Sequence, residues 1–588
     1  MKKAIVAVFV ILFILAGAAA GVYYYYFMPS SLMVPAFEEG KLVLIIEGEI
    51  DSSQSAPKVV DGEILLPLET VKKYFDPNIY WDESSKKVTI TTDKKVIRMK
   101  TDNLEAMVNN KPMNLKIPAS VDNNVIYIPI EFLKDLYNIE ISYLKNNNVI
   151  IIDYTNKVKQ LGEVIKPITP EAVIRKTTST RSPILKKYYP ASEKPEDIAL
   201  RILQTYDKWY KVRAADGTIG YIEKRFVVVK DLVVEKLPRE EAPSTAWKPE
   251  KGRINVVWEM MYGKRPDLSK INKMEGLDVI SPTWFQIANE QGELINRADP
   301  KYVDWAHENG YKVWALVSND FNNIQMTKKF LNNTDARENA IKKLLAYASL
   351  YKLDGINIDF ENIYKEDKNA LTQFVRELTP LLKEQGLIVS IDVTVPDGSD
   401  TWSLCFDRKA LGQVVDYVML MAYDQHWSTS PKAGSVAQIT WVENNLKRVL
   451  EMVPKEKLLL GLPFYTRVWK EETGSDGKVK LTSQALSMEA ARKAIKDNNG
   501  VVSWDEASGQ FYAEYKKDNL TYKVWLEDEN SINLKSSLVQ KYNLAGAAAW
   551  KRSDEVPGIW TVLNKNLKGM ESYQAWMDEN KERKYVFN

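Results

Sequence analysis

The sequence predicts an α/β protein whose largest part is a (β/α)8 (TIM) barrel with a small α+β insertion. Between residues 252 and 575, eight apolar strand patterns alternate with helical patterns, which is typical of βα units around a parallel sheet. The interval between the seventh and eighth strands is long enough for added structure. Before residue 252, short strands separated by turns predict smaller β-rich domains, and a long apolar run opens the chain.

The eight strand candidates are short apolar runs, spaced so that a helix fits between each pair. They cover residues 254–258, 279–281, 313–317, 355–360, 388–393, 417–421, 458–462 and 546–550. Two further β patterns, at 500–504 and 512–525, fall between the last two strands. We expect these to form the insertion, placed over the barrel mouth.

The fourth strand pattern, residues 353–361, is the most informative stretch of the chain. Apolar and polar residues alternate with period two, so Asn357, Asp359 and Glu361 should share one face of a strand. Two carboxyl groups side by side in a partly dry site repel, which raises the pKa of one of them. Such a group can donate a proton near neutral pH. The alternative is an amphipathic surface strand with chance acids.

Composition limits the other functional classes. Of the 588 residues, 45% are hydrophobic, enough for several cores. Lys and Arg (80) nearly balance Asp and Glu (78), so no global field favours nucleic acid. Cys405 is the single cysteine, which excludes an intramolecular disulfide, and the two histidines, His307 and His426, form no zinc motif. We therefore expect no metal and no cofactor.

The amino terminus has the pattern of a signal anchor. Lys2 and Lys3 precede an uncharged run over residues 4–28, long enough to span a bilayer as a helix. Four tyrosines at 23–26 suit the outer interface, and the positive end should stay inside. We expect residues 1–28 to form a single transmembrane helix with the catalytic domain outside the cell membrane. Cleavage near the small residues 17–21, giving a secreted protein, is the alternative.

Residues 41–155 contain an internal repeat. The segment 64–75 matches 126–137, with Pro67 and Pro129 equivalent, and each copy runs into a β-rich segment. This pattern resembles the copper-amine-oxidase amino-terminal-like (stalk) domain of bacterial envelope proteins. No cluster of metal ligands accompanies it, so a spacer or binding role is expected.

Residues 170–231 read as an all-β domain. Trp209-Tyr210 begins a central strand, Asp216-Gly217 marks a hairpin turn, and Tyr221 lies on the returning strand. The order of these residues resembles bacterial SH3-like domains, which commonly bind cell-wall peptides. The aromatic side chains could equally belong to the core. Residues 232–251 have the mixed polar composition of a linker.

The predicted carboxyl ends of the barrel strands combine aromatic, carboxylate and amide side chains. In (β/α)8 barrels this end of the sheet carries the site. Aromatic faces with polar partners suit a sugar ring and its hydroxyl groups. Strand-end residues include Trp258, Asn319, Asn357, Asp359, Glu361, Asp392, Thr394, Met421, Tyr423, Asp424, Tyr465, Arg467 and Trp550.

Three of these strands resemble family-18 glycoside hydrolases of the bacterial cell-wall and spore branch. Residues 354–361 (DGINIDFE) resemble the family's DGxDxDxE strand, 421–424 (MAYD) its MxYD strand, and Trp550 its final-strand tryptophan. The resemblance covers residues 252–570 or so. It implies a glycosidase that uses the substrate's own 2-acetamido group as nucleophile.

The resemblance also implies roles for matching positions. Glu361 would be the general acid and base, Asp359 would orient the acetamido group, and Tyr423 would donate to its oxygen. Trp550 would form the floor of the sugar site. Asp424, Trp258 and Arg467 are predicted to bind substrate.

Asn357 departs from the pattern, because the family usually has Asp there. An amide cannot share a proton with Asp359, but it can hydrogen-bond the strand's interior. We expect Asn357 to support the site as a substrate-binding residue.

The implied substrate is a glycan containing β-linked N-acetylglucosamine. The anchor and the two envelope-type domains favour peptidoglycan over chitin. Two alternatives remain open: a chitinase or chitobiase, and a catalytically silent protein that binds wall glycan. Wall peptide, bound through the SH3-like domain, and the membrane are the other expected partners, and nucleic acid is not.

Overall fold

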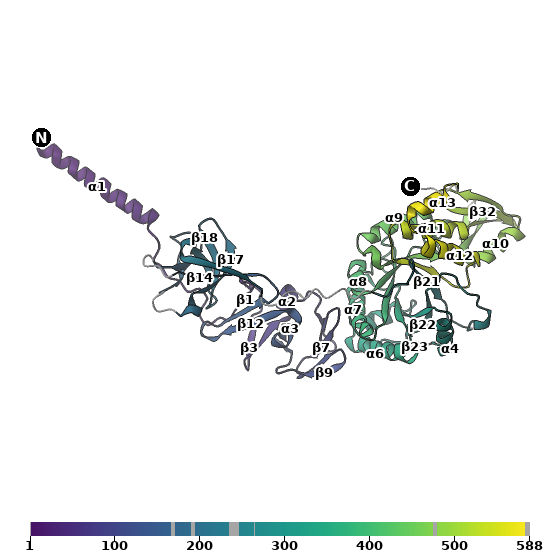
Figure 1. Cartoon of the computed structure of the whole chain (residues 1–588), viewed down its shortest axis with the longest axis horizontal. Coiled ribbons are helices and arrows are strands. Elements are labelled where there is room, and N and C mark those ends of the chain that lie inside the picture. Colours follow the sequence, from purple (N-terminus) through teal and green to yellow (C-terminus); the bar gives the residue numbers. More distant parts are fainter. Residues whose placement is uncertain are drawn as a thin grey trace. The chain divides into compact units, whose positions relative to one another are not determined.

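The computed structural model describes residues 2–165, 171–189, 194–234, 246–263, 265–473 and 479–582. The chain divides into two compact units (Figure 1). The first comprises residues 1–79, 99–106 and 112–243, and the second comprises residues 80–98, 107–111 and 244–588. Much of the predicted linker, residues 235–245, lies outside the described residues.

The chain opens with a single long helix, α1 (Lys2–Phe27). Residues 5–24 of this helix are long and apolar enough to cross a membrane, with a mean hydropathy of 2.9 and no burial inside the protein. A signal sequence has the same properties. The predicted apolar helix is therefore present, and it is either an anchor or a signal sequence.

The first unit contains two small sheets built from the repeated segments. Strand β1 (Val43–Ile46) pairs in parallel with β13 (Val149–Tyr154), so the two ends of the predicted stalk domain lie side by side. Strand β4 (Glu63–Pro67) pairs with β11 (Val125–Pro129), which brings the two repeat copies together. The helix α2 (Leu68–Tyr74) follows β4, and α3 (Lys134–Tyr137) follows β11 after a short turn.

A seven-stranded sheet completes the first unit, in the order β16-β15-β19-β18-β17-β14-β20. It includes β15 (Val173–Arg175), β16 (Ile184–Lys187) and β17 (Ala199–Thr205). Its strands run from β14 (Lys159–Val164) to β20 (Val227–Val233), so it begins before residue 170. The predicted hairpin joins β18 (Trp209–Ala214) to β19 (Ile219–Glu223), and Gly217 adopts a positive φ in the turn. Trp209 is buried, which places it in the core of this sheet.

The second unit is the predicted barrel, and all eight predicted strands are present. They pair in parallel in chain order, and β21 pairs with both β22 and β34, which closes the barrel. The strands are β21 (Ile254–Glu259), β22 (Val279–Ile287), β24 (Lys312–Ser318), β25 (Gly355–Asp359), β26 (Ile388–Thr394), β27 (Tyr417–Met421), β28 (Leu458–Pro463) and β34 (Gly546–Trp550).

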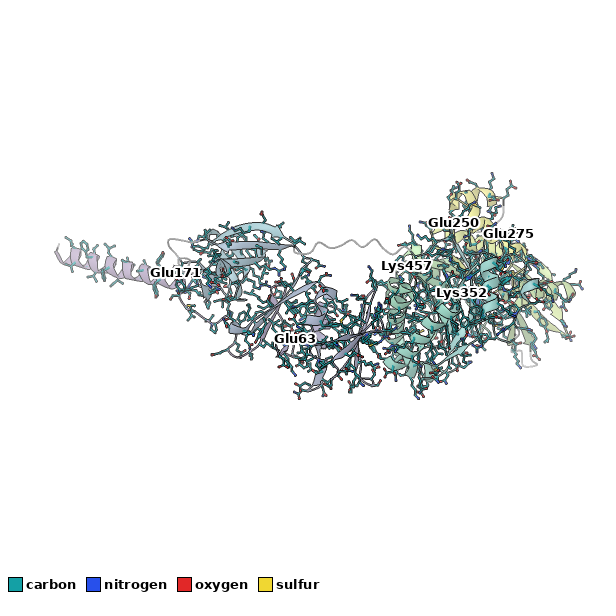
Figure 2. The ribbon with its side chains drawn as sticks, turned by 60° about the horizontal axis from the view of Figure 1, so that its bottom comes forward. Glu63, Glu171, Glu250, Glu275, Lys352 and Lys457 are labelled. Atoms are coloured by element: carbon teal, nitrogen blue, oxygen red, sulfur yellow. The ribbon has the colours of Figure 1, made fainter. Side chains whose placement is uncertain are left out.

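Helices surround the strands (Figure 1). They are α4 (Pro300–Glu308), α5 (Ile324–Leu331), α6 (Thr334–Leu350), α7 (Lys368–Glu384), α8 (Arg408–Val414), α9 (Ile439–Leu450), α11 (Glu529–Lys541), α12 (Gly558–Asn564) and α13 (Tyr573–Asn580). Apolar residues on the outer strand face pack against these helices, and inward residues such as Val256, Trp314 and Met419 fill the barrel. Charged side chains such as Glu275 and Lys352 lie on the outside (Figure 2).

The amino-terminal end of β25 explains the first two residues of the DGINIDFE segment. Asp354 accepts hydrogen bonds from the Val313 backbone and from Lys312 and His307. A side chain on Gly355 would come within 2.8 Å of the Trp314 indole, so only glycine fits there. Asp354 and Gly355 are therefore structural residues, and so is His307, which bonds Asp354.

The predicted insertion forms a separate five-stranded antiparallel sheet, in the order β30-β29-β33-β32-β31. Its strands are β29 (Tyr465–Thr473), β30 (Val479–Ser487), β31 (Val501–Asp505), β32 (Gln510–Lys517) and β33 (Leu520–Trp525). The helix α10 (Met488–Asp497) packs against it. The two predicted β patterns correspond to β31 and to β32 with β33, whereas β29 and β30, which follow the seventh barrel strand directly, were not predicted.

One part of the second unit comes from the predicted stalk domain. Residues 80–98 contribute β5 (Tyr80–Asp82), β6 (Lys87–Thr91) and most of β7 (Val96–Lys100). Arg98 reaches the carboxylate of Glu377 on α7, which is also held by Arg337 of α6. All three side chains are buried, and the Arg337 guanidinium lies over the Tyr80 ring. We call Arg98, Glu377 and Arg337 the buried ion-pair network.

Candidate active site

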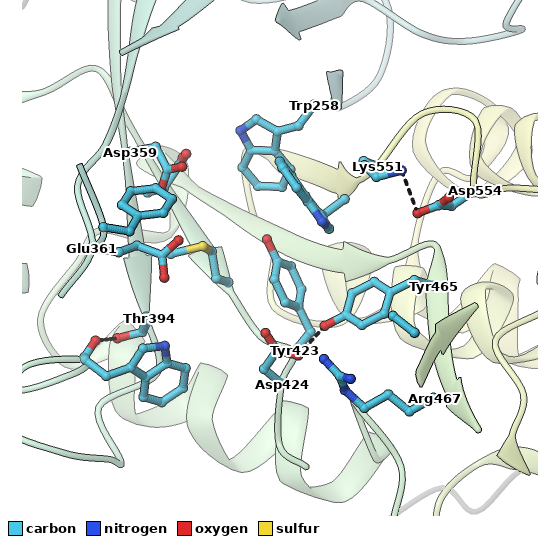
Figure 3. A pocket seen from close by; sticks show the side chains of 16 residues that line it. Trp258, Asp359, Glu361, Thr394, Tyr423, Asp424, Tyr465, Arg467, Lys551 and Asp554 are labelled. Carbon is cyan, nitrogen blue, oxygen red and sulfur yellow. Dashed lines mark hydrogen bonds and ion pairs between the residues drawn. The ribbon is translucent and has the colours of Figure 1, made fainter. Parts of the chain in front are cut away.

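A cavity of about 350 Å³ opens at the carboxyl ends of the barrel strands. It brings together seven of the eight predicted site residues, and Figure 3 shows the acids Asp359 and Glu361 opposite Tyr465 and Arg467. The lining residues are Trp258, Phe321, Asp359, Glu361, Asp392, Thr394, Trp402, Met421, Tyr423, Asp424, Tyr465, Arg467, Ala485, Trp550, Lys551 and Asp554. Asn357 is the predicted residue that does not line it.

Glu361 is held in place through its backbone. Strand β25 ends at Asp359, so Glu361 lies two residues beyond the strand. The Asn319 side chain donates to the Glu361 carbonyl (2.8 Å) and accepts from its backbone N–H (2.9 Å). The same amide donates to Thr327 Oγ1 on α5. This two-sided clamp fixes where the carboxyl group of Glu361 emerges.

Asn357 lies beneath the cavity and is fully buried. Its carbonyl oxygen accepts from Trp258 Nε1 (2.8 Å) and Ser281 Oγ (3.2 Å). Its amide nitrogen donates to Ser390 Oγ (3.1 Å) and to the Asp392 carboxyl (2.8 Å). These contacts hold Trp258, which lines the cavity, and the Asp392 carboxyl in place, while Asn357 itself is not among the lining residues. An aspartate here would face Asp392 and would need a proton between the two carboxyl groups.

Three neighbouring carboxyl groups resist ionisation at this site. Burial raises the pKa of Glu361 to about 7, and the Asp424 carboxylate adds to that effect. Burial, together with the charges of Glu361 and Asp392, raises the pKa of Asp359 well above its usual range. Burial also raises the pKa of Asp392, although hydrogen bonds from Asn357 and Trp258 oppose it. The group therefore keeps protons at neutral pH.

Asp359 has an acceptor available for a ligand. Its Oδ1 is buried and has no hydrogen-bond partner among the described residues. A buried acceptor without a partner carries a free-energy cost that a ligand donor can remove. Across the cavity, burial and the nearby acids raise the pKa of Tyr423, so its hydroxyl stays protonated and can donate. One wall thus offers an acceptor and the other a donor.

Two tryptophans form the aromatic side of the cavity. Trp258 and Trp550 lie with ring centroids 6.3 Å apart. The segment after Trp550 is anchored because Arg552 forms an ion pair with buried Glu259 and its backbone N–H bonds the Trp258 carbonyl. Tyr302 donates to the same glutamate. These contacts hold the last strand's loop against the first strand.

Asp424, Tyr465 and Arg467 form the remaining wall. The Tyr465 hydroxyl donates to the Asp424 carboxyl, as Figure 3 shows. Burial raises the pKa of Asp424, while this hydrogen bond and the Arg467 charge lower it. Arg467 Nε is buried and has no partner among the described residues. Its guanidinium therefore retains a donor for a ligand.

Sequence reasoning missed several lining residues. Asp392, Thr394, Met421 and Tyr465 were predictable as strand ends but had no assigned role. Phe321, Trp402, Lys551 and Asp554 are on loops without a periodic signal, and Ala485 lies on β30 of the insertion. His426 does not line the cavity, and its ring bonds the Ser435 carbonyl. Among the described residues, no group of three His, Cys, Asp or Glu side chains is placed to hold a metal ion.

A sugar-sized cavity with carboxyl groups and tryptophans at the mouth of a (β/α)8 barrel is typical of glycosidases. Residues 262–555 match the family model "Glycosyl hydrolases family 18", which covers half of the chain. The chain belongs to this family. Residues 45–152 match "Copper amine oxidase N-terminal domain", in agreement with the resemblance of the repeated segments.

Curated proteins similar to the chain include the following three. "Uncharacterized glycosylase YvbX" of Bacillus subtilis is 26% identical over 47% of this chain and 82% of that protein. The "Cortical fragment-lytic enzyme" of Bacillus subtilis is 28% identical over 41% of this chain and 56% of that protein. "Di-N-acetylchitobiase" of Mus musculus is 25% identical over 45% of this chain and 76% of that protein. The chain thus spans little more than half of the cortical fragment-lytic enzyme.

Proposed function

We propose that this protein hydrolyses β-linked N-acetylglucosamine in peptidoglycan by substrate-assisted, retaining catalysis. The observation that carries the proposal is the pairing at the end of β25. Glu361 has a pKa of about 7, and Asp359 beside it has a buried oxygen without a partner. The first suits a proton donor at neutral pH, and the second suits the N–H of an acetamido group.

In the first step, the substrate's acetamido oxygen attacks the anomeric carbon while the glycosidic C–O bond breaks. Glu361 gives its proton to the leaving oxygen. Glu361 is left as a carboxylate, whose negative charge offsets the positive charge of the oxazolinium. The unpartnered oxygen of Asp359 accepts from the oxazolinium N–H. The protonated Tyr423 hydroxyl donates to the acetamido oxygen and aligns it for attack.

In the second step, water attacks the anomeric carbon, and the bond to the acetamido oxygen breaks. Glu361, now a carboxylate, takes the proton from that water, so the enzyme returns to its starting state. Two displacements give net retention of configuration. Trp258 and Trp550 would support the sugar ring from one side, and Asp424 and Arg467 would bind its hydroxyl groups.

Two observations support peptidoglycan as the glycan. One curated relative is named a cortical fragment-lytic enzyme. The apolar helix α1 suits an anchor that keeps the barrel outside the cell membrane, next to the wall. The similarity to a di-N-acetylchitobiase favours a second candidate, hydrolysis of chitin oligosaccharides.

The test is digestion of purified peptidoglycan by the detergent-solubilised full chain, with Glu361→Gln as the matched control. New reducing ends with the wild type and none with the variant would support the proposal. Borohydride reduction of the products identifies the new end, and reduced N-acetylglucosamine is expected. Glycan binding without new reducing ends would instead indicate a silent binding protein, and hydrolysis of chitin oligosaccharides alone would indicate a chitobiase.

A further inference from the structure

A second cavity of about 590 Å³ adjoins the first. The two share Trp402 and Asp424, whereas Trp258 and Trp550 line only the first. In the view of Figure 3, Trp258 lies near the top and Asp424 lower down, with Glu361 at a height between them. If the N-acetylglucosamine ring stacks on Trp550, the bond to be cleaved lies beside Glu361. The sugar ring on the leaving side then occupies the second cavity.

The wall that separates the two cavities is rigid. Trp402 belongs to the loop after β26, and its carbonyl accepts from Thr394 Oγ1 (2.7 Å). The buried guanidinium of Arg408 donates to the carbonyls of Thr394, Val395 and Ser403. A side chain on Gly398 would come within 2.6 Å of the Trp402 ring, so the indole packs directly on the backbone there. Trp402 is therefore a fixed platform.

The second cavity offers aromatic surface and acceptors to a ligand. Trp427, with half of its surface exposed, and Trp441 join Trp402, while Ser399 and Gln425 are neutral polar residues. Aromatic faces of this kind suit the apolar face of a sugar ring.

The charges in this cavity are all of one sign. The charged side chains among its described lining residues are Asp397 and Asp424, both carboxyl groups. Two cations act on these carboxyl groups from outside the lining. The Arg448 guanidinium is 3.7 Å from the Asp397 carboxyl and donates to the Pro396 carbonyl (2.7 Å). Arg467, whose charge lowers the pKa of Asp424, lines the first cavity, as does Lys551. A carboxylate entering the second cavity would therefore meet like charge, which disfavours binding.

We propose that the second cavity selects a muramyl ring whose lactyl carboxyl is uncharged because it is in amide linkage. The inference rests on the proposed function, in which the ring on the leaving side is N-acetylmuramic acid. In intact strands the lactyl carboxyl forms an amide with the stem peptide, and in strands stripped of peptide it is a free carboxylate. Peptide-bearing glycan is then the preferred substrate, and stripped glycan is disfavoured.

The experiment compares two substrates that differ in this charge. Peptidoglycan strands stripped of peptide by an amidase are divided, and one half is coupled to methylamine so that each lactyl carboxyl becomes a neutral amide. The full chain in detergent is assayed on both, and kcat/KM is expected to be about fivefold higher on the amidated strands, a like-charge effect reduced by solvent screening. Raising the salt concentration should bring the ratio of the two kcat/KM values closer to one.

Two variants locate the effect. Asp397→Asn should bring the ratio towards one by raising kcat/KM on stripped strands. Asp400→Asn removes the same charge from the same loop but outside the cavity lining, where Asp400 pairs with Lys365, and should leave the ratio as in the wild type. A wild-type ratio of one or less, or equal shifts in the two variants, would overturn the inference. Failure to hydrolyse either substrate would overturn the proposed function and this inference with it.

Discussion

The ionisation of Glu361 gives a quantitative prediction for the pH dependence of activity. Burial raises its pKa from the ordinary value of 4.5 to about 7. At pH 7 about half of the molecules then hold the proton, compared with about one in three hundred for an ordinary glutamate. Burial and the Asp424 carboxylate together thus increase the population of the acid form about 150-fold at that pH.

The expected profile of kcat/KM has a basic limb with its midpoint near pH 7. Because the general acid must be protonated, activity should fall about tenfold for each further pH unit. Glu361 titrates together with neighbouring carboxyl groups, so this midpoint belongs to the group. The assay is hydrolysis of a soluble fluorogenic N-acetylglucosamine oligomer between pH 4 and 9.

Asp424→Asn tests the cause of the shift. The Asp424 carboxylate raises the pKa of Glu361, so its removal should move the basic limb to lower pH. Asp554→Asn is the matched control, since Asp554 lines the same cavity but does not contribute to the Glu361 shift. A wild-type midpoint below pH 5.5, or equal movement in both variants, would refute the reasoning.

Three further predictions concern buried polar groups. Glu377→Gln removes the carboxylate that pairs with two buried guanidinium groups and should lower the free energy of unfolding by about 3–5 kcal/mol in urea denaturation. Arg98→Met leaves the Arg337–Glu377 ion pair in place and should lower it less. The Asp82 carboxylate accepts a hydrogen bond from the first backbone N–H of α6, and the pKa of Asp82 is lowered in the folded protein. The ionised Asp82 therefore stabilises the fold at pH values above its unfolded-state pKa, and this stabilisation is lost as pH falls below about 4. Thermal melts of Asp82→Asn should therefore show a weaker acid destabilisation than the wild type. Asn357→Asp adds a carboxyl group beside Asp392 and should move the basic limb of the kcat/KM profile to higher pH. An unchanged basic limb would contradict the contact between residue 357 and Asp392.

Much of the barrel was predictable because its signals are local. Eight apolar strand patterns appear in the sequence, and each becomes a barrel strand. The carboxyl ends of parallel strands meet at one edge, so strand-end residues such as Glu361, Tyr423 and Trp550 had to lie near one another. Seven of the eight predicted site residues line the cavity for this reason.

The contacts of Asn357 were not predictable in the same way. Its partners lie on other strands of the barrel, far from it in sequence. Whether the side chain faces the cavity or the barrel interior depends on the packing of Trp258 and Asp392 around it. Trp402 was missed because it is on a loop, where no periodic pattern indicates direction. Its position follows from Arg408 and Gly398, which are close to it in sequence but whose contacts depend on the path of the loop.

The sequence by itself determined the barrel, the apolar amino-terminal helix, and the strand that carries Asp359 and Glu361, because each depends on the spacing of nearby residues. Only the tertiary structure decided which side chains surround the acidic groups of the site and how strongly those groups hold their protons. Arg98 and Glu377 are 279 residues apart in sequence, yet they share one buried network. The pKa of Glu361 likewise depends on burial by many segments, and burial is a property of the whole fold.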